Sequence, residues 1–301
     1  MTISSVAGLS PHVTTERSVI DLLGWARELV EPEARRWVDT LGPKSRLVAG
    51  YQLGWWDASG APANGEGQVL RPALVLLCAM TVGGTAGDAV TAAVGAEFVH
   101  AFSLMHDDVM DRDPMRCGRA AAWTVFGAPA TLAAADELMS LAFEGFFRRT
   151  GNIDTACAAA ATLGQAVARI ARSQALGLAF DYTDAVTLEQ RVSMEADQTA
   201  SLLATATRLG ALYGGATVEA ADRLTAFGEH LGRAAARAAL AEQAGGEDWV
   251  RQSANWHLRS ALGQLRRERA HTDDAAARAA ANELAALARF AVSRACRGPG
   301  A

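Results

Sequence analysis

Apolar side chains recur at helical spacing along most of this chain, and the pattern predicts helices separated by short polar breaks. The first such segment, residues 15–42, predicts one or two amphipathic helices, with Trp25, Leu29 and Trp37 on the apolar side. Residues 57–68 are rich in Gly, Pro, Asn and Ser. We therefore expect a loop at this second segment.

Two apolar helices are predicted to follow the loop. Pro72 suits the first turn of one that continues into the sequence ALVLLCAM. Residues 88–111 predict the other, which is apolar on nearly every side and should be buried by neighbours all round. We expect Asp88 to be its N-cap, and Pro114 and Gly118 to end it.

Helical patterns fill the rest of the chain. They cover residues 128–148, 152–180, 187–213, 217–243, 247–269 and 273–297. The sequence shows no β-hairpin or βαβ pattern, and no short repeat or low-complexity linker divides it. We therefore predict an all-α fold in a single domain over residues 1–301, with about 14 N-terminal and about 5 C-terminal residues frayed.

Composition and charge exclude several classes of protein. Half of the 301 residues are hydrophobic, and the net charge of -5 gives no electrostatic reason to expect a nucleic-acid partner. The apolar stretch PALVLLCAMTVGG is too short for a transmembrane segment, and the N-terminus lacks the layout of a signal peptide. The cysteines have neither metal-site nor disulfide spacing, which favours the reducing cytoplasm; they are Cys78, Cys117, Cys157 and Cys296.

Residues 103–119, SLMHDDVMDRDPMRCGR, place three aspartates at the end of an apolar helix. Asp107 and Asp111 are one helical turn apart on one face, and Asp108 is offset from them. Carboxylates this close repel each other, and a hard divalent cation such as Mg²⁺ relieves the repulsion. The spacing therefore indicates a metal site.

A solvated surface turn is the alternative interpretation of the same aspartates. In it, the acids lie at an exposed helix end and pair with Arg112 and Arg116. The apolar run VGAEFVHAFSLMH before the cluster favours the metal site, because it draws this helix into the core. Acids near a helix C-terminus also oppose the helix dipole, so they are better explained by a bound cation.

The sequence around the aspartates, EFVHAFSLMHDDVMDRDPMRCGR, resembles the first aspartate-rich motif, DDxxD, of the trans-isoprenyl diphosphate synthases, the polyprenyl synthetase family. Three more segments resemble that family in the same order: GYQLGWWDASGAPANGEGQVLRPALVLL, QTASLLATATRLGALYGG and LTAFGEHLGRAAA. The resemblance covers roughly residues 40–235, with a weaker match in the tail, and is most specific over 97–118.

The resemblance implies an all-α, isoprenoid-synthase-type bundle around a central cavity, with its C-terminal half shortened here. Such proteins are usually homodimers that hold an allylic isoprenoid diphosphate through Mg²⁺ and two aspartate motifs. Loss of the diphosphate leaves an allylic cation, which isopentenyl diphosphate attacks. By position, Asp107, Asp108 and Asp111 would ligate Mg²⁺ and serve catalysis.

The resemblance also assigns roles outside the aspartates. Thr199 matches the threonine beside the catalytic lysine of the family. Positions matching substrate contacts are Arg116 for the allylic diphosphate, Arg71 and His100 for isopentenyl diphosphate, Gln174, and Phe102 as a floor of the tail pocket. The residues alone leave other interpretations open: a surface cation at a helix start, a core histidine, an ordinary helix threonine and a core aromatic side chain.

Several positions depart from the family pattern. Lysines are replaced by Gln68 and Gln198, an arginine by Cys117 and an aspartate by Gly177. The helix expected to carry the second aspartate motif reads AAARAALAEQ, and a following loop and helix are missing. The remaining acid pairs are better interpreted as helix starts; they are Glu247 with Asp248 and Asp273 with Asp274.

Three functions remain open at this point. The first is a Mg²⁺-dependent enzyme that ionises a geranyl- or farnesyl-type diphosphate and passes the cation to a non-standard acceptor, or cyclises it. The second is a standard trans-polyprenyl diphosphate synthase that condenses it with isopentenyl diphosphate. The third is a non-catalytic regulatory subunit or degenerate paralogue that modulates an active synthase through the dimer interface. The expected assembly is a homodimer or a heterodimer with a related synthase.

Overall fold

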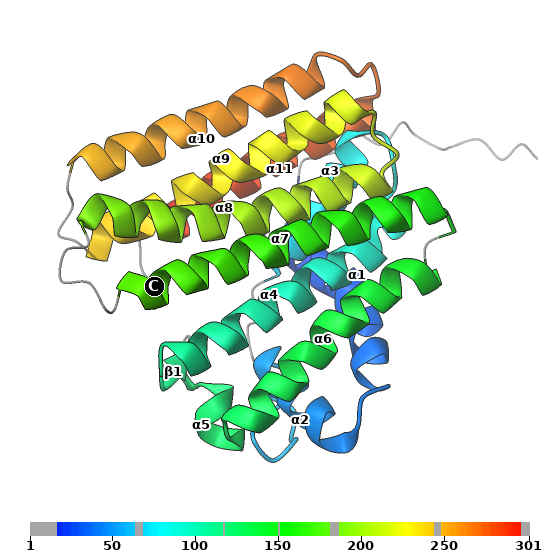
Figure 1. Ribbon diagram of the computed structural model, residues 1–301. Helices are drawn as coiled ribbons and strands as arrows, with labels where there is room; N and C mark the ends of the chain where they lie inside the picture. The colour runs from blue at the N-terminus through cyan, green and yellow to red at the C-terminus, as the bar shows by residue number, and fades with distance from the viewer. Residues whose placement is uncertain are drawn as a thin grey trace, which may run out of the picture.

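Helices make up nearly all of this computed structural model, which describes residues 17–63, 69–116, 118–149, 151–180, 187–243 and 248–295 (Figure 1). In chain order they are α1 (Val19–Val38), α2 (Pro43–Gln52), α3 (Leu70–Thr81), the 3₁₀ turn η1 (Gly87–Ala89), α4 (Val90–Met110), α5 (Ala122–Phe126), α6 (Ala128–Arg149), α7 (Ile153–Phe180), α8 (Leu188–Tyr213), α9 (Val218–Gln243), α10 (Asp248–Arg269) and α11 (Ala275–Ala295). The predicted all-α fold is confirmed.

The long helices are arranged in two groups. Helices α7, α8, α9 and α10 lie side by side in that order (Figure 1). Helices α1, α3 and α4 pack against one another and α6 packs on α4, while α3 and α4 also contact α8. Helix α11 packs on α3, α9 and α10. This arrangement brings the C-terminal end of α4 beside α7 and α8, where the aspartates lie.

Apolar periodicity predicted the helices from α6 to α11 to within a few residues of their observed ends. Helix α4 is buried as expected, with Phe98 and Met105 fully enclosed. Pro72 lies in the first turn of α3, and Asp274 caps α11 by accepting a hydrogen bond from the Ala276 amide at 2.9 Å. These four expectations are confirmed.

Other predicted details are wrong. Asp88 does not cap α4; it accepts hydrogen bonds from the amide and hydroxyl of Thr85 and lies within η1. Leu29 was expected on the buried apolar side of α1, but its side chain is 37% exposed. The sequence pattern also missed α2 and a two-stranded antiparallel pair, β1 (Met115–Arg116) with β2 (Arg119–Ala120). Of the predicted loop 57–68, residues 64–68 lie outside the described part.

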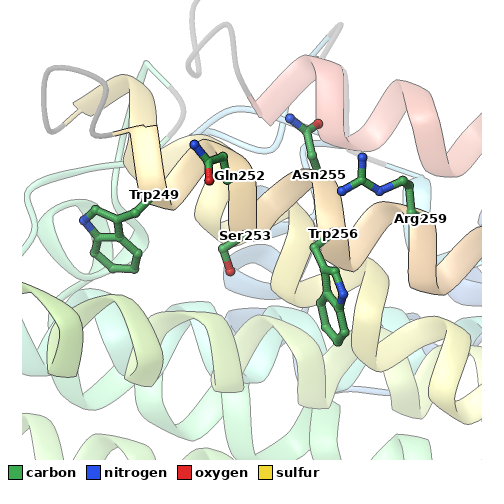
Figure 2. A pocket seen from close by; sticks show the side chains of 6 residues that line it. All are labelled: Trp249, Gln252, Ser253, Asn255, Trp256 and Arg259. Carbon is green, nitrogen blue, oxygen red and sulfur yellow. The ribbon is translucent and has the colours of Figure 1, made fainter.

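Figure 2 shows α10, whose side chains Trp249 and Trp256 point toward the same side of the helix and line an open groove of about 530 Å³. The Trp256 ring packs edge-on against His230 of α9 and His257 of α10. The Nδ1 atoms of these histidines are 3.0 Å apart, so one donates and the other accepts. Burial first, then Arg237, lowers the pKa of His257 to about 4, so it is neutral at pH 7. The contact of His257 with His230 and the ion pair of Arg223 with Glu268 both join α10 to α9.

No helix within the described ranges is both long and apolar enough to cross a bilayer. Cys78 is buried and Cys157 is exposed, and both are free thiols. Burial raises the pKa of Cys78, so this thiol is uncharged and behaves as a small apolar core residue.

Helices α3 and α8 approach closely because α8 presents a glycine at their contact. A Cβ atom on Gly210 would lie 2.2 Å from the Val75 carbonyl oxygen and 2.8 Å from the Cys78 Cβ. Gly210→Ala is therefore expected to force the two helices apart and lower the free energy of unfolding by about 1–3 kcal/mol, measured by urea denaturation.

The control is Gly164→Ala in α7, where a Cβ atom would meet no atom within 4 Å. This change should leave stability unchanged or raise it by about 0.5–1 kcal/mol, because alanine favours a helix more than glycine does. Equal effects at the two positions would contradict the packing of α3 on α8.

Candidate active site

Helix α4 ends at the aspartate cluster in a turn that redirects the chain. Asp111 is the C-cap, its amide donates to the Asp107 carbonyl at 2.8 Å, and Arg112 follows with φ 56°. The Asp113 amide donates to the Asp108 carbonyl at 3.0 Å, which is the 6→1 bond typical of a Schellman motif. The left-handed residue turns the chain back toward α4.

Because of this turn, β1 returns Arg116 to the end of α4. The Arg116 Nε donates to Asp108 Oδ1 at 2.8 Å, and Nη2 contacts the same oxygen. The Asp108 side chain is 1% exposed, and its Oδ2 has no hydrogen-bond partner in the described residues. Burial raises the pKa of Asp108 and the Arg116 guanidinium opposes that rise. Asp108 and Arg116 thus form an enclosed ion pair.

Asp107 points toward α7 and α8 and receives one amide from each. Gln174 Nε2 donates to its Oδ1 at 2.7 Å, and Gln198 Nε2 donates to its Oδ2 at 3.0 Å. The two glutamines are 67 and 91 residues away in sequence. These contacts fix the orientation of a half-buried carboxylate, and they place the predicted substrate residue Gln174 at the cluster.

Asp107 and Asp111 together suit a single hard cation. Burial first, and then repulsion from Asp111, raises the pKa of Asp107, although the hydrogen bond from Gln174 opposes this. Two carboxylates one turn apart that disfavour each other's charge gain from a shared cation. No group of three or more His, Cys, Asp or Glu side chains is assembled as a metal site in the described part of the chain. Asp107 and Asp111 therefore fit a metal site whose remaining ligands would come from a diphosphate and from waters.

Arg71, Glu97 and His100 form a second polar cluster, between α3 and α4. Arg71 Nε, Glu97 Oε2 and His100 Nδ1 are each buried without a hydrogen-bond partner among the described residues. Burial first, then Arg71, then Arg116, holds the pKa of His100 well below its usual range, so this imidazole is neutral. Arg71 is therefore not a solvated surface cation, and the cluster offers unsatisfied polar atoms to a ligand or to water.

Glu97 has its pKa raised to about 7 by burial, and Arg71 partly opposes the rise. Between pH 4.5 and 7 the folded protein holds a proton that the unfolded chain releases, so stability falls as the pH rises through this window. Glu97→Gln is expected to remove this fall, which amounts to at most about 3 kcal/mol. The measurement is the free energy of unfolding of both proteins at pH 5 and pH 8.

The exposed Glu28 of α1 provides the control, since Glu28→Gln should leave the pH dependence as it is in the wild type. Parallel pH curves for wild type and Glu97→Gln would show that Glu97 titrates as an ordinary surface acid.

Thr199 and Phe102, the remaining site residues predicted from the sequence, lie close in sequence to residues of the aspartate cluster. Thr199 follows Gln198 on α8, and its side chain forms no hydrogen bond with another described residue. Phe102 is 9% exposed, lies about one and a half turns before Asp107, and its ring packs on His106 at 4.3 Å between centroids. Gln68 and Cys117 lie outside the described residues, and only the backbone of Gly177, within α7, is described.

Helix α9 is the helix in which the family resemblance leads one to expect a second acidic motif; alanine and leucine stand at the expected acids, and Arg233 and Arg237 lie just before them. Arg233 Nε lies 3.2 Å from Asp197 of α8, and Arg233 Nη1 lies 3.8 Å from Glu229. Arg237 follows one turn later, with Nε and Nη1 buried and unpartnered among the described residues. Asp248 begins α10, as the helix-start interpretation predicts, and Glu247 lies outside the described part.

Two contributors to these clusters were missed from the sequence. Gln198 was counted only as the loss of a lysine, yet its neutral amide binds Asp107. Glu97 lies inside the segment that resembles the first aspartate motif, about one helical turn before His100. Polar residues at this spacing share a helix face, and that spacing is the sequence signal for their contact.

The sequence profile of the family described as Polyprenyl synthetase matches residues 58–234. The (2E,6E)-farnesyl diphosphate synthase of Mycobacterium tuberculosis strain H37Rv is 37% identical over 233 residues, which are 75% of this chain and 64% of that protein. The short chain isoprenyl diphosphate synthase of Methanothermobacter thermautotrophicus is 33% identical over 216 residues, 72% of this chain and 63% of that protein. The chain thus spans less than two thirds of the length of these curated relatives.

Solved structures agree with this similarity. The polyprenyl synthetase of Streptomyces coelicolor A3(2) superposes with a TM-score of 0.80 and 30% identity, covering 91% of this chain and 100% of that one. The geranylgeranyl pyrophosphate synthetase of the archaeon Geoglobus acetivorans superposes with a TM-score of 0.76 over 93% of this chain at 20% identity, a likeness of fold.

Proposed function

Because this chain belongs to the polyprenyl synthetase family, we propose that it is a prenyltransferase-type enzyme that binds and ionises an allylic isoprenoid diphosphate at the end of α4. The proposal treats residues 1–301 as one domain and follows the cysteine pattern in placing it in the cytoplasm. The substrate class is that of the relatives, which are named farnesyl and geranylgeranyl diphosphate synthases.

One observation carries this proposal: two carboxylates, Asp107 and Asp111, stand one turn apart, and burial first, then repulsion from Asp111, raises the pKa of Asp107. Gln174 and Gln198 hold Asp107 in place from two other helices. Asp108 forms an ion pair with Arg116. Asp107 instead receives neutral amides, which fix its position and leave its negative charge for a cation to neutralise.

Mg²⁺ is the cation that this donor set fits, since it prefers a few carboxylate oxygens with waters and a substrate phosphate. Asp107 and Asp111 would hold it, and Asp108 would join them on release from Arg116. Bound there, the ion would neutralise the charge that grows on a departing diphosphate. Phe102, one and a half turns before Asp107, would limit the length of the prenyl tail on the apolar side.

The standard condensation with isopentenyl diphosphate is the second candidate. It is favoured by Arg71 and His100, which match acceptor-site positions and keep buried, unpartnered nitrogen atoms beside Glu97. The first candidate, transfer to a non-standard acceptor or cyclisation, is favoured by Gln198 in place of a cation and by the arginines of α9. Arg116, released from Asp108, and Thr199 would then contact the diphosphate in either reaction.

One experiment separates these reactions. Purified protein is incubated with Mg²⁺ and geranyl or farnesyl diphosphate, with and without isopentenyl diphosphate, and the products are identified by mass spectrometry. Longer prenyl diphosphates would support the condensation, whereas diphosphate release without isopentenyl diphosphate would support the first candidate. No turnover in either case, together with binding to an active synthase, would overturn the proposal in favour of a regulatory subunit in a heterodimer.

A further inference from the structure

We propose that a cleft bounded by α7, α8 and α9 is an anion subsite that binds the diphosphate group of a ligand through Arg169 and Arg172. The cleft encloses about 600 Å³, within the usual range for small-molecule sites. It lies beside the aspartate cluster and shares Gln198 with it, while its other lining residues are separate. The chemistry of its walls, taken helix by helix, supports this assignment.

The α7 wall supplies arginines that form no ion pair with a carboxylate of the described residues. Arg169 Nε donates to the Ser201 hydroxyl at 2.8 Å, so a neutral group positions this guanidinium. Arg172 follows three residues later on the same face and forms no ion pair with any residue in the described ranges. Guanidinium groups bind phosphate oxygens through paired N–H donors, which makes this wall suitable for a diphosphate.

The α9 wall is closer to balanced. Arg233 contributes a third positive charge, but its contacts with Asp197 and Glu229 offset it. The three arginines and two carboxylates of the lining therefore leave a surplus of one positive charge. Arg237, one turn further along α9, places another guanidinium nearby, and burial first, then repulsion from Arg233, lowers its pKa.

Apolar side chains flank the charged wall. Leu176, which is 54% exposed, and Met194 lie in the same cleft as the arginines. An exposed leucine beside unpaired guanidinium groups suits a ligand with an anionic head and a hydrocarbon tail. A prenyl diphosphate has this form, and identifying it as the ligand rests on the proposed function; inorganic diphosphate shares only the head.

Gln198 connects the cleft to the aspartate cluster. Its side chain lines the cleft, and its Nε2 donates to Asp107. Positions 172 and 174 differ by about 200° around a helix, so Arg172 and Gln174 project from opposite sides of α7. The α7 backbone thus separates the cleft from Asp107, and the Gln198 amide connects the two. A diphosphate can therefore bind in the cleft without the metal ion of the aspartate cluster.

The test is a titration of the full chain with inorganic diphosphate, followed by isothermal calorimetry at low ionic strength in EDTA. We expect binding by the wild type and a loss of affinity of about tenfold or more in Arg169→Gln and in Arg172→Gln, the effect of one charge-assisted contact. Arg251→Gln, which removes an exposed charge from α10, should change the affinity less than twofold.

The subsite would be overturned if the wild type does not bind inorganic diphosphate, or if both cleft variants lose less than tenfold in affinity. An equal loss of affinity in Arg251→Gln would also overturn it. Farnesyl diphosphate is titrated in the same buffer as a second arm. Tighter binding of it than of inorganic diphosphate, reduced by Leu176→Ser, would assign the cleft to a prenyl ester, whereas equal affinity would assign it to free diphosphate.

These outcomes are independent of the proposed function. Turnover requires Mg²⁺ and Asp111, whereas the titration excludes Mg²⁺ and measures no reaction. Diphosphate binding in EDTA without any turnover in Mg²⁺ would keep the subsite and reject the enzyme. Turnover without binding in EDTA would do the reverse.

Discussion

Asp111→Asn is expected to reduce the Mg²⁺-dependent release of diphosphate from farnesyl diphosphate by about 100-fold or more, the usual effect of removing one electrostatic group from a reaction centre. Asp111 is the exposed C-cap of α4, and asparagine keeps its shape while removing its charge. The fold should therefore survive. The measurements are the rate of diphosphate release and the affinity for Mg²⁺, which should fall together.

Asp113→Asn provides the matched control, because Asp113 is also exposed, lies two residues further on, and approaches Arg116 only at 4.0 Å. We expect this variant to keep its rate to within a few-fold. Equal rates for wild type and Asp111→Asn would exclude the Asp107 and Asp111 pair as the metal site. Equal losses in both variants would instead indicate a general effect of negative charge near β1.

The aspartate spacing could be predicted because it depends only on local helix geometry. Once residues 88–111 are assigned to a helix, Asp107 and Asp111 must share a face. The same reasoning located helices α6 to α11, whose amphipathic pattern is long. Two-residue strands such as β1 and β2 have no period to detect, and α2 has only ten residues, so both were missed.

The partners of the aspartates could not be predicted in this way. Gln174 and Gln198 reach Asp107 across 67 and 91 residues, so the contact depends on how α4, α7 and α8 pack. Gln198 shows the consequence most clearly. From the sequence it was a missing cation, and in the fold it is a hydrogen-bond donor that joins the aspartate cluster to the arginine-lined cleft.

Arg116→Gln is expected to lower the free energy of unfolding by about 3 kcal/mol, because it leaves Asp108 buried and without its partner. The value is at the lower end for a buried ion pair, since the Arg116 side chain is 34% exposed whereas that of Asp108 is 1% exposed. Urea denaturation at pH 7 provides the measurement. Arg148→Gln should change stability by less than about 1 kcal/mol, because the pair of Arg148 with Glu144 is exposed.

Adding Asp108→Asn to Arg116→Gln should recover much of the lost stability, since the buried charge and its partner are then removed together. If the double variant is no more stable than Arg116→Gln, the ion pair does not account for the effect of losing Arg116.

The double variant also separates two roles for one side chain. A diphosphate can bind Arg116 only by drawing it away from Asp108. The Asp108 carboxylate would then be buried without a positive partner, which is unfavourable unless a cation takes the place of the guanidinium. Ligand binding by Arg116 and cation binding by Asp108 are therefore expected to be linked. A double variant that folds well but has lost Mg²⁺-dependent binding of farnesyl diphosphate would support that linkage, and one that binds it as the wild type does would leave Arg116 a purely structural partner.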